Sequence, residues 1–94
     1  MTTSVFDLKR APTHPGAVLR EDILPALEAE TVSGFAAKLR ISRQALHNIL
    51  AEKSAISPSI AIRLAKILET SPEFWLNLQT KYDLWQALQS ENAA

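Results

Sequence analysis

The chain has 94 residues and no cysteine, and its ten basic and ten acidic side chains give a formal net charge of zero at pH 7. This length fits one domain with a modest core, and the lack of thiols excludes disulfides and thiolate metal sites. Zero net charge argues against a protein that binds nucleic acid over its whole surface.

Residues 1–13 mix Thr, Ser, Pro and charged residues and are predicted to form a flexible N-terminal arm. Residues 1–11 contain no long apolar run, so we expect no secretory signal, no membrane span and a cytoplasmic location. His14 starts the first helix, with Pro15 at its first position. Pro25 should kink or end this helix within a residue or two.

Four further helices are predicted from capping residues that precede apolar residues at helical spacing. The predicted caps are Thr31 or Ser33, then Ser42, Ser57 and Ser71. No segment alternates cleanly at period two, so the fold class is predicted to be all-α with five helices. Residues 14–89 would form one domain, followed by a frayed tail at 90–94.

Basic and acidic residues are concentrated in different parts of the chain, although the net charge is zero. Residues 31–68 hold six basic residues and one acid, a net +5, whereas the rest of the chain holds four basic residues and nine acids, a net −5. A basic middle suits a polyanion. Acidic flanks suit a basic partner, or only solubility.

The segment from Ser33 to Leu50 has the spacing of two helices joined by a short turn. Ala36 and Ala45 are small enough for the helices to cross closely, and Ile41 would fill the turn between them. This is a helix-turn-helix arrangement, with the second helix presented outward.

Four side chains on that second helix share its exposed face, because their positions are related by i, i+1, i+4 and i+5. They are Arg43, Gln44, His47 and Asn48. Arg can bond to guanine, and Asn or Gln to adenine, while Ser42 at the helix start is a natural phosphate contact. The alternative is an ordinary solvated face; the helix in front, the short turn and the basic surroundings favour DNA.

Other basic residues are assigned with less specificity. Lys53 follows the second helix, in a loop that touches the DNA backbone in domains similar to this one, and is predicted to do so here, with a solvated loop as the alternative. Lys38 can meet a phosphate or only water. Arg63 and Lys66 are expected to face solvent or pair with acids rather than to face DNA.

The two histidines, His14 and His47, have no cysteines or clustered carboxylates near them in the sequence. A zinc site needs three or four convergent ligands, and the serines at helix starts are explained by capping. We therefore expect no metal, no cofactor and no enzymatic activity.

The last predicted helix carries more aromatic surface than five short helices can bury. Phe74, Trp75 and Leu78 are expected to complete the core of the monomer. The remaining residues of the stripe are predicted to form a homodimer interface: Tyr82, Leu84, Trp85 and Leu88. A dimer would place two recognition helices about 34 Å apart on a palindromic operator.

The sequence resembles the HigA/VapI group of antitoxins in the XRE-like helix-turn-helix class. The likeness runs through HPGAVLRE, FAAKLRISRQALHNIL and AISPSIAIRLAKILETSPEFWLNLQTKYDLWQAL, and covers residues 14–88. The resemblance implies a lambda-repressor-like fold and a dimeric bacterial antitoxin. Such a protein would neutralise a HigB-type toxin, an RNase similar to RelE, and repress its own operon by binding double-stranded operator DNA.

Two positions depart from the family pattern. Arg40 replaces the turn glycine, so it must adopt a backbone conformation that favours glycine, at a cost of about 1 kcal/mol; we predict that it compensates by contacting a phosphate. The connection 28–31 also lacks the family's usual glycine.

A toxin that binds RNA should be basic, so the acids near the first helix are the predicted toxin contacts. They are Glu21, Asp22, Glu28 and Glu30. A solubilising acidic face is the alternative. Two other functions also stay open: a free-standing transcriptional regulator without a toxin, and a protein-interaction module whose helix-turn-helix is a relic.

Overall fold

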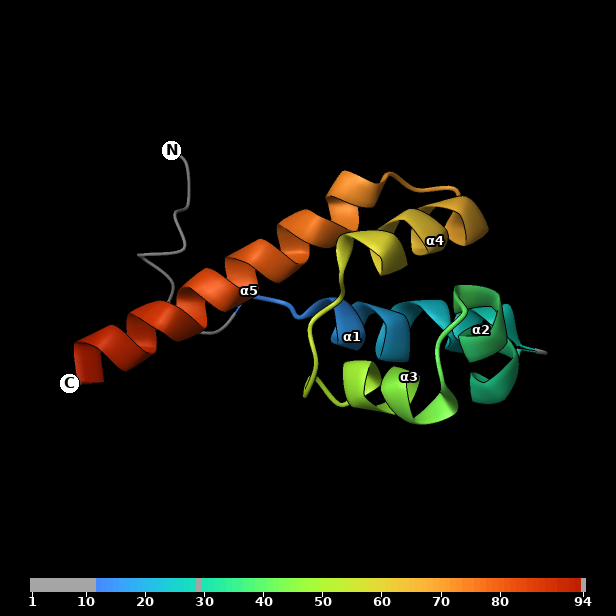
Figure 1. Cartoon of the computed structure of the whole chain (residues 1–94), viewed down its shortest axis with the longest axis horizontal. Coiled ribbons are helices and arrows are strands. Elements are labelled where there is room, and N and C mark those ends of the chain that lie inside the picture. The colour runs from blue at the N-terminus through green and yellow to red at the C-terminus, as the bar shows by residue number, and fades with distance from the viewer. Residues whose placement is uncertain (1–11, 29, 94) are drawn as a thin grey trace.

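The computed structural model describes residues 12–28 and 30–93, and within these residues all regular structure is helical. Most of the predicted N-terminal arm lies outside the described residues. Four helical segments pack into a cluster, and the fifth leaves this cluster as a long rod (Figure 1). The predicted all-α class with five helices is confirmed. Among the described residues, no helix combines the length and the apolar character needed to cross a membrane.

The first helical segment changes its winding along its length. It begins as α1 (Pro15–Val18), continues as a π-helical turn, η2 (Leu19–Ile23), and ends as a 3-10 turn, η3 (Pro25–Leu27). Pro25 has no N–H to donate, so the π-helical turn stops before it and only the short 3-10 turn follows. The predicted effect of Pro25 is confirmed.

The other helices are α2 (Val32–Leu39), α3 (Arg43–Leu50), α4 (Pro58–Leu68) and α5 (Pro72–Ala93). Each begins at a hydroxyl that accepts a hydrogen bond from the backbone N–H three residues later. These four caps are Thr31, Ser42, Ser57 and Ser71, with N···O distances of 2.9, 2.9, 3.2 and 3.1 Å. A cap of this kind stabilises a helix by about 1 kcal/mol. Helix α5 continues through residues 90–93, which the sequence assigned to a frayed tail.

The core is built from the inward faces of all five segments. Its fully buried members are Leu19, Phe35, Leu39, Leu46, Ala61, Leu64 and Trp75. The indole Nε1 of Trp75 donates to Oγ1 of Thr70 at 2.8 Å. Leu78 packs against this core as expected. The prediction for Phe74 is wrong: it is 45% exposed, because neighbouring residues on a helix point about 100° apart and only Trp75 faces inward.

Helix α3 is held closely from behind by α1. A Cβ atom on Gly16 would lie only 1.8 Å from the carbonyl oxygen of Ile49, so the two backbones touch at a place where no side chain fits. His14 caps α1 by accepting from the N–H of Gly16 through Nδ1 at 2.8 Å. The buried His14 ring also meets the Tyr82 ring edge-on, with 4.7 Å between centroids. The HPG segment therefore joins α1 to both α3 and α5.

Two longer side chains complete this support. Nη1 of Arg20 donates to the carbonyl oxygen of Leu50 at 2.6 Å, so it satisfies one of the carbonyls at the end of α3. The buried Gln79 accepts from the N–H of Ile56 at 3.0 Å and donates to Asp83 at 2.9 Å. The loop between α3 and α4 is thereby fixed to α5.

Candidate nucleic-acid interface

The turn between α2 and α3 is made at Arg40. This residue has φ 57° and ψ 40°, in the left-handed region. Its N–H bonds to the carbonyl of Ala37, and the N–H of Ile41 bonds to that of Ala36, both at 3.1 Å. This pair of bonds forms a Schellman motif, which glycine usually closes. The predicted backbone conformation of Arg40 is confirmed.

Helix α3 has a buried and an exposed side, as predicted. Leu46, Ile49 and Leu50 face the core. On the opposite side Arg43, Gln44 and His47 are exposed and Asn48 is half-buried. The sequence-predicted base-facing residues are therefore together on one surface, next to the Ser42 cap.

Two of these side chains are already paired. Nε2 of Gln44 donates to Oδ1 of Asn48 at 3.1 Å. This bond leaves the Gln44 carbonyl oxygen as an acceptor and the Asn48 amide group as a donor, which is the donor and acceptor pattern that a base edge can use. Pairing also restricts the rotamers of both side chains before any ligand arrives.

Lys53 lies in the loop after α3 and is exposed. The helix ends in a second Schellman motif, in which the N–H of Lys53 bonds to the carbonyl of Asn48 at 2.8 Å. Glu52 has a φ of 62° there, again in the region that favours glycine. The backbone thus fixes where Lys53 leaves the helix, beside the exposed side of α3.

The basic residues outside α3 are placed differently from the prediction in one case. Arg63 neither faces only solvent nor pairs with an acid: its Nη1 donates to the carbonyl oxygen of Leu39 at 3.0 Å, at the end of α2. Lys38 is ion-paired with Glu30, and Lys66 is exposed on α4.

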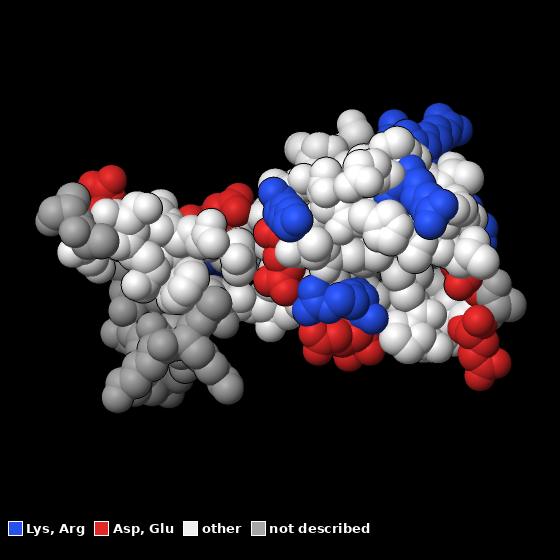
Figure 2. All heavy atoms as spheres, turned by 90° about the horizontal axis from the view of Figure 1, so that it is seen from below, with Lys and Arg blue, Asp and Glu red and all other residues white. Residues whose placement is uncertain are grey.

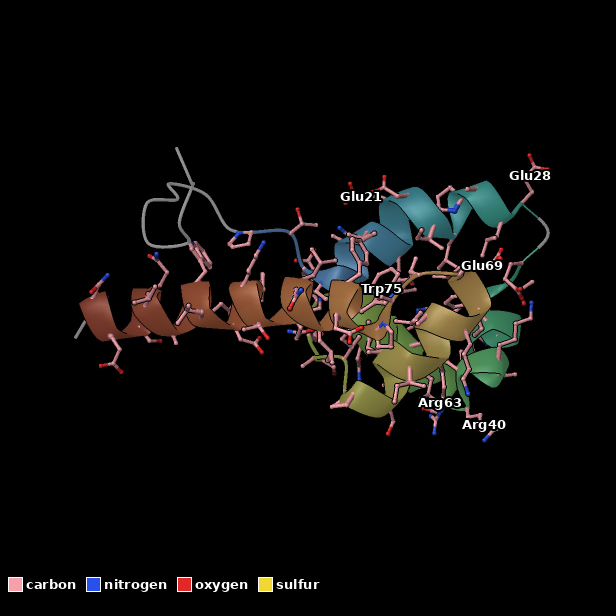
Figure 3. All side chains as sticks on the ribbon, turned by 90° about the horizontal axis from the view of Figure 1, so that it is seen from above. Glu21, Glu28, Arg40, Arg63, Glu69 and Trp75 are labelled. Atoms are coloured by element: carbon pink, nitrogen blue, oxygen red, sulfur yellow. The ribbon has the colours of Figure 1, made fainter. Side chains whose placement is uncertain are left out.

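Charge is distributed unevenly around this interface. In the view onto α3, one group of Lys and Arg side chains lies along one edge of the helical cluster, and most acids lie toward the opposite edge, where a second basic group lies among them (Figure 2). Figure 3 labels Glu21 and Glu28 on the α1 side, and Arg40 and Arg63 on the α4 side. The segregation seen in the sequence is therefore also a segregation in space.

The four acids predicted to contact a toxin are not equivalent. Asp22 and Glu28 are exposed, and Glu21 is exposed but pairs with Nη2 of Arg20 at 2.6 Å. The side chain of Glu30 is only 15% exposed and is held by Lys38. Three of the four acids thus remain accessible, whereas Glu30 is largely committed within the chain.

The residues predicted for a dimer interface fall into two groups, those on the outer part of α5 and Tyr82, which contacts its own chain. Leu84 is 40% exposed, and Trp85 and Leu88 are half-buried on the outer part of α5. The Nε1 atom of Trp85 is buried and has no hydrogen-bond acceptor among the described residues. Tyr82 instead packs on His14 of its own chain, so part of its surface is used within the monomer.

Two supporting residues have shifted pKa values. Burial lowers the pKa of His14, against the opposing effect of Glu52 and Asp83. Hydrogen bonds to Glu21 and Glu52 raise the pKa of Arg20. The supporting contacts of Arg20, Gly16 and Gln79 were not predicted from the sequence, although the HPG segment was a signal that the first turn of the helix is specialised.

Comparison with known proteins places this arrangement in a family. A family model described as helix-turn-helix matches residues 31–75. An uncharacterized HTH-type transcriptional regulator of Haemophilus influenzae is 42% identical over 78 residues, 83% of this chain and 72% of that protein.

Two solved structures share the fold of the chain. An addiction module antidote protein of a HigA family from Coxiella burnetii is 38% identical, with a TM-score of 0.80 over 89% of this chain and 90% of that one. The Pseudomonas aeruginosa antitoxin HigA, solved with the higBA promoter, is 34% identical, with a TM-score of 0.80 over 87% and 88% of the two chains. The chain therefore belongs to the XRE-like helix-turn-helix family that includes the HigA antitoxins.

Proposed function

We propose that this protein is the antitoxin of a type II toxin-antitoxin system, which neutralises an RNase toxin of HigB/RelE type and represses its own operon by binding operator DNA as a homodimer. The observation that carries the DNA-binding half is the exposed face of α3, where a Gln44–Asn48 pair stands beside Arg43 and the Ser42 cap. The P. aeruginosa HigA structure, which contains the higBA promoter, supports the same half.

In this proposal the N-terminal part of α3 enters the major groove. Arg43 bonds to guanine O6 and N7, and the Gln44–Asn48 pair bonds to adenine or a neighbouring base edge. The Ser42 hydroxyl accepts from the N–H of Ala45 at 2.9 Å, so its own hydrogen is left to donate to a phosphate. His47 lies on the same face, and Lys53 contacts the backbone beyond the end of α3.

A homodimer is proposed through the outer part of α5. Leu84, Trp85 and Leu88 supply apolar surface there. Trp85 and Leu88 are half-buried and Leu84 is exposed, so a second copy of the chain could cover the surface that they leave open. The dimer would present two copies of α3 to one face of the DNA.

Toxin binding is proposed at the acidic side of the domain, through Glu21, Asp22 and Glu28. A toxin that acts on RNA has a basic active surface, which these carboxylates complement. Glu21 and Glu28 lie on the side away from Arg40 and Arg63 (Figure 3). A toxin and DNA could therefore occupy the chain at the same time.

The DNA half is tested with Arg43→Ala and Lys53→Ala, titrated against a duplex from the region upstream of the gene and a scrambled duplex of equal composition. Arg43→Ala should weaken binding to the upstream duplex by about 1–3 kcal/mol and leave the scrambled duplex almost unaffected. Lys53→Ala should weaken both duplexes alike and lower the salt slope by about 1. Equal losses on both duplexes for Arg43→Ala would refute direct readout.

The second candidate is a transcriptional regulator without a toxin. The name of the H. influenzae relative favours it. The two functions share the same DNA face, and co-purification separates them. An antitoxin should co-purify with a small basic protein encoded by the neighbouring gene, whereas a free-standing regulator should not.

A further inference from the structure

A hollow of about 310 Å³ opens on the surface between the end of α2 and the outer side of α4. The described residues that line it include four basic side chains and no carboxylate. Its main lining residues are Lys38 and Arg40 from the end of α2, and Ser59, Ile62, Arg63 and Lys66 from α4. Arg63 and Lys66 were not predicted to face DNA, and they join this cluster because α4 packs against α2.

Three of the four cations keep their charge available. Arg63 is fixed by its bond to the neutral carbonyl of Leu39, which leaves its other N–H groups free for a ligand. Arg40 and Lys66 are exposed, and neither side chain has a hydrogen bond or ion pair with a described residue. Lys38 is the exception, because Glu30 neutralises it.

The hollow adjoins the proposed DNA-reading surface. Arg40 is two residues from Ser42, the cap of α3, so the hollow begins where the base-facing helix begins. Arg40 and Arg63 project on the same side of the domain (Figure 3). A major groove is bordered by a sugar-phosphate strand on each side, so a helix that lies in it has a strand alongside both of its flanks.

We propose that this hollow, through Arg40, Arg63 and Lys66, binds the phosphodiester backbone of DNA that flanks the bases read by α3. Guanidinium groups match phosphate oxygens in a bidentate fork, and a lysine adds a point charge. Ile62, which is 47% exposed, lies against the sugar edge between successive phosphates. The inference rests on the proposed DNA binding and extends it to a second, sequence-independent surface.

The test uses two substitutions, each with a matched control. Arg40→Gly removes one cation and also relieves the strain of a left-handed backbone. Its control is Glu69→Gly, because Glu69 has a φ of 56°. This control relieves the same backbone strain without removing a cation. Lys66→Gln removes a second cation, and Lys81→Gln makes the same change of charge on exposed α5. Binding is measured against the scrambled duplex over a series of salt concentrations.

Arg40→Gly and Lys66→Gln should each weaken binding to the scrambled duplex by about threefold to tenfold, and each should lower the slope of log K against log salt by about 0.9. Glu69→Gly and Lys81→Gln should leave both quantities unchanged. Arg40→Gly should nevertheless raise the melting temperature, as Glu69→Gly does. If the Arg40→Gly variant is more stable but binds DNA less tightly, its weaker binding comes from a lost DNA contact and not from unfolding.

The proposal is overturned if both hollow variants bind the duplexes with wild-type affinity and salt slope. It is also overturned if they keep DNA binding but lose a co-purified protein partner, because the hollow would then accept an acidic polypeptide. Failure of the proposed function has a different result: Arg43→Ala would lose no preference for the upstream duplex, whatever the hollow variants do to the scrambled one.

Discussion

Helix α3 and the outer part of α5, residues 84–93, are held in opposite ways. Helix α3 is fixed from behind by the Gly16 backbone, by Arg20 at its last carbonyls and by its own serine cap. The outer part of α5 runs away from the cluster (Figure 1) and leaves Leu84 40% exposed. The chain thus determines the position of the proposed DNA-reading helix by itself, whereas its last three turns carry apolar surface that suits a second molecule.

The largest effect should come from filling the contact behind α3. Gly16→Ala places a Cβ 1.8 Å from the Ile49 carbonyl oxygen, so α1 and α3 must separate. We expect the free energy of unfolding to fall by about 3 kcal/mol or more, as measured by urea denaturation.

Gly34→Ala is the matched control. Its Cβ would approach Oε1 of Glu30, the end of a flexible side chain, at 2.5 Å. Its effect should stay below about 1 kcal/mol. Equal effects of the two substitutions would show that the close contact does not hold α3.

Substitutions in the outer part of α5 should weaken the association of two chains and leave the folding of each chain unchanged. Trp85→Ala combined with Leu88→Ala should raise the dimer dissociation constant by about 100-fold or more, because a buried tryptophan is often a main contributor at an interface. Sedimentation equilibrium measures this change, and circular dichroism should show that the helical content is retained.

Thr80→Ala with Glu91→Ala alters two exposed residues of α5 and should leave the association unchanged. If the Trp85 and Leu88 variant still sediments as a dimer, the two-fold contact lies elsewhere on the chain.

A smaller effect on folding stability is expected from pH, because the buried His14 changes its protonation state. Burial lowers its pKa in the folded chain, so the unfolded chain binds the proton more readily. Stability is therefore full above the ordinary histidine pKa of about 6.5 and is lost as the pH falls below it. Protonation would also remove the Nδ1 acceptor that caps Gly16.

His14→Asn keeps a side-chain cap and should flatten the dependence of the unfolding free energy on pH between about 6.5 and 5. His47→Asn, at an exposed position, should leave the dependence as it is in the unchanged chain. A wild-type protein whose stability rises on acidification would contradict the assignment to His14.

The features that the sequence predicted correctly depend on residues close together in the chain. The serine and threonine caps, the break at Pro25 and the left-handed Arg40 each follow from local backbone chemistry. The exposed face of α3 follows from helical periodicity. These are signals that one short segment contains by itself.

The features that the sequence missed join residues far apart. Arg20 reaches Leu50, 30 residues away, and Arg63 reaches Leu39, 24 residues away. Neither bond has a local signature, because it exists only once the helices have packed. The error at Phe74 has the same origin: a stripe of aromatic residues shows that a helix has an inner face, but the packing partners decide which of two neighbours occupies it.

The contact between Gly16 and Ile49 also affects which distance between operator half-sites a dimer could bind. Through His14 and Tyr82, the same few residues that press on α3 also press on α5. No flexible linker separates the proposed reading helix from the proposed pairing helix. In the proposed dimer, the two copies of α3 are therefore held at a fixed separation by packed side chains. How much the dimer tolerates a longer or shorter gap between operator half-sites depends on how stiff this packing is.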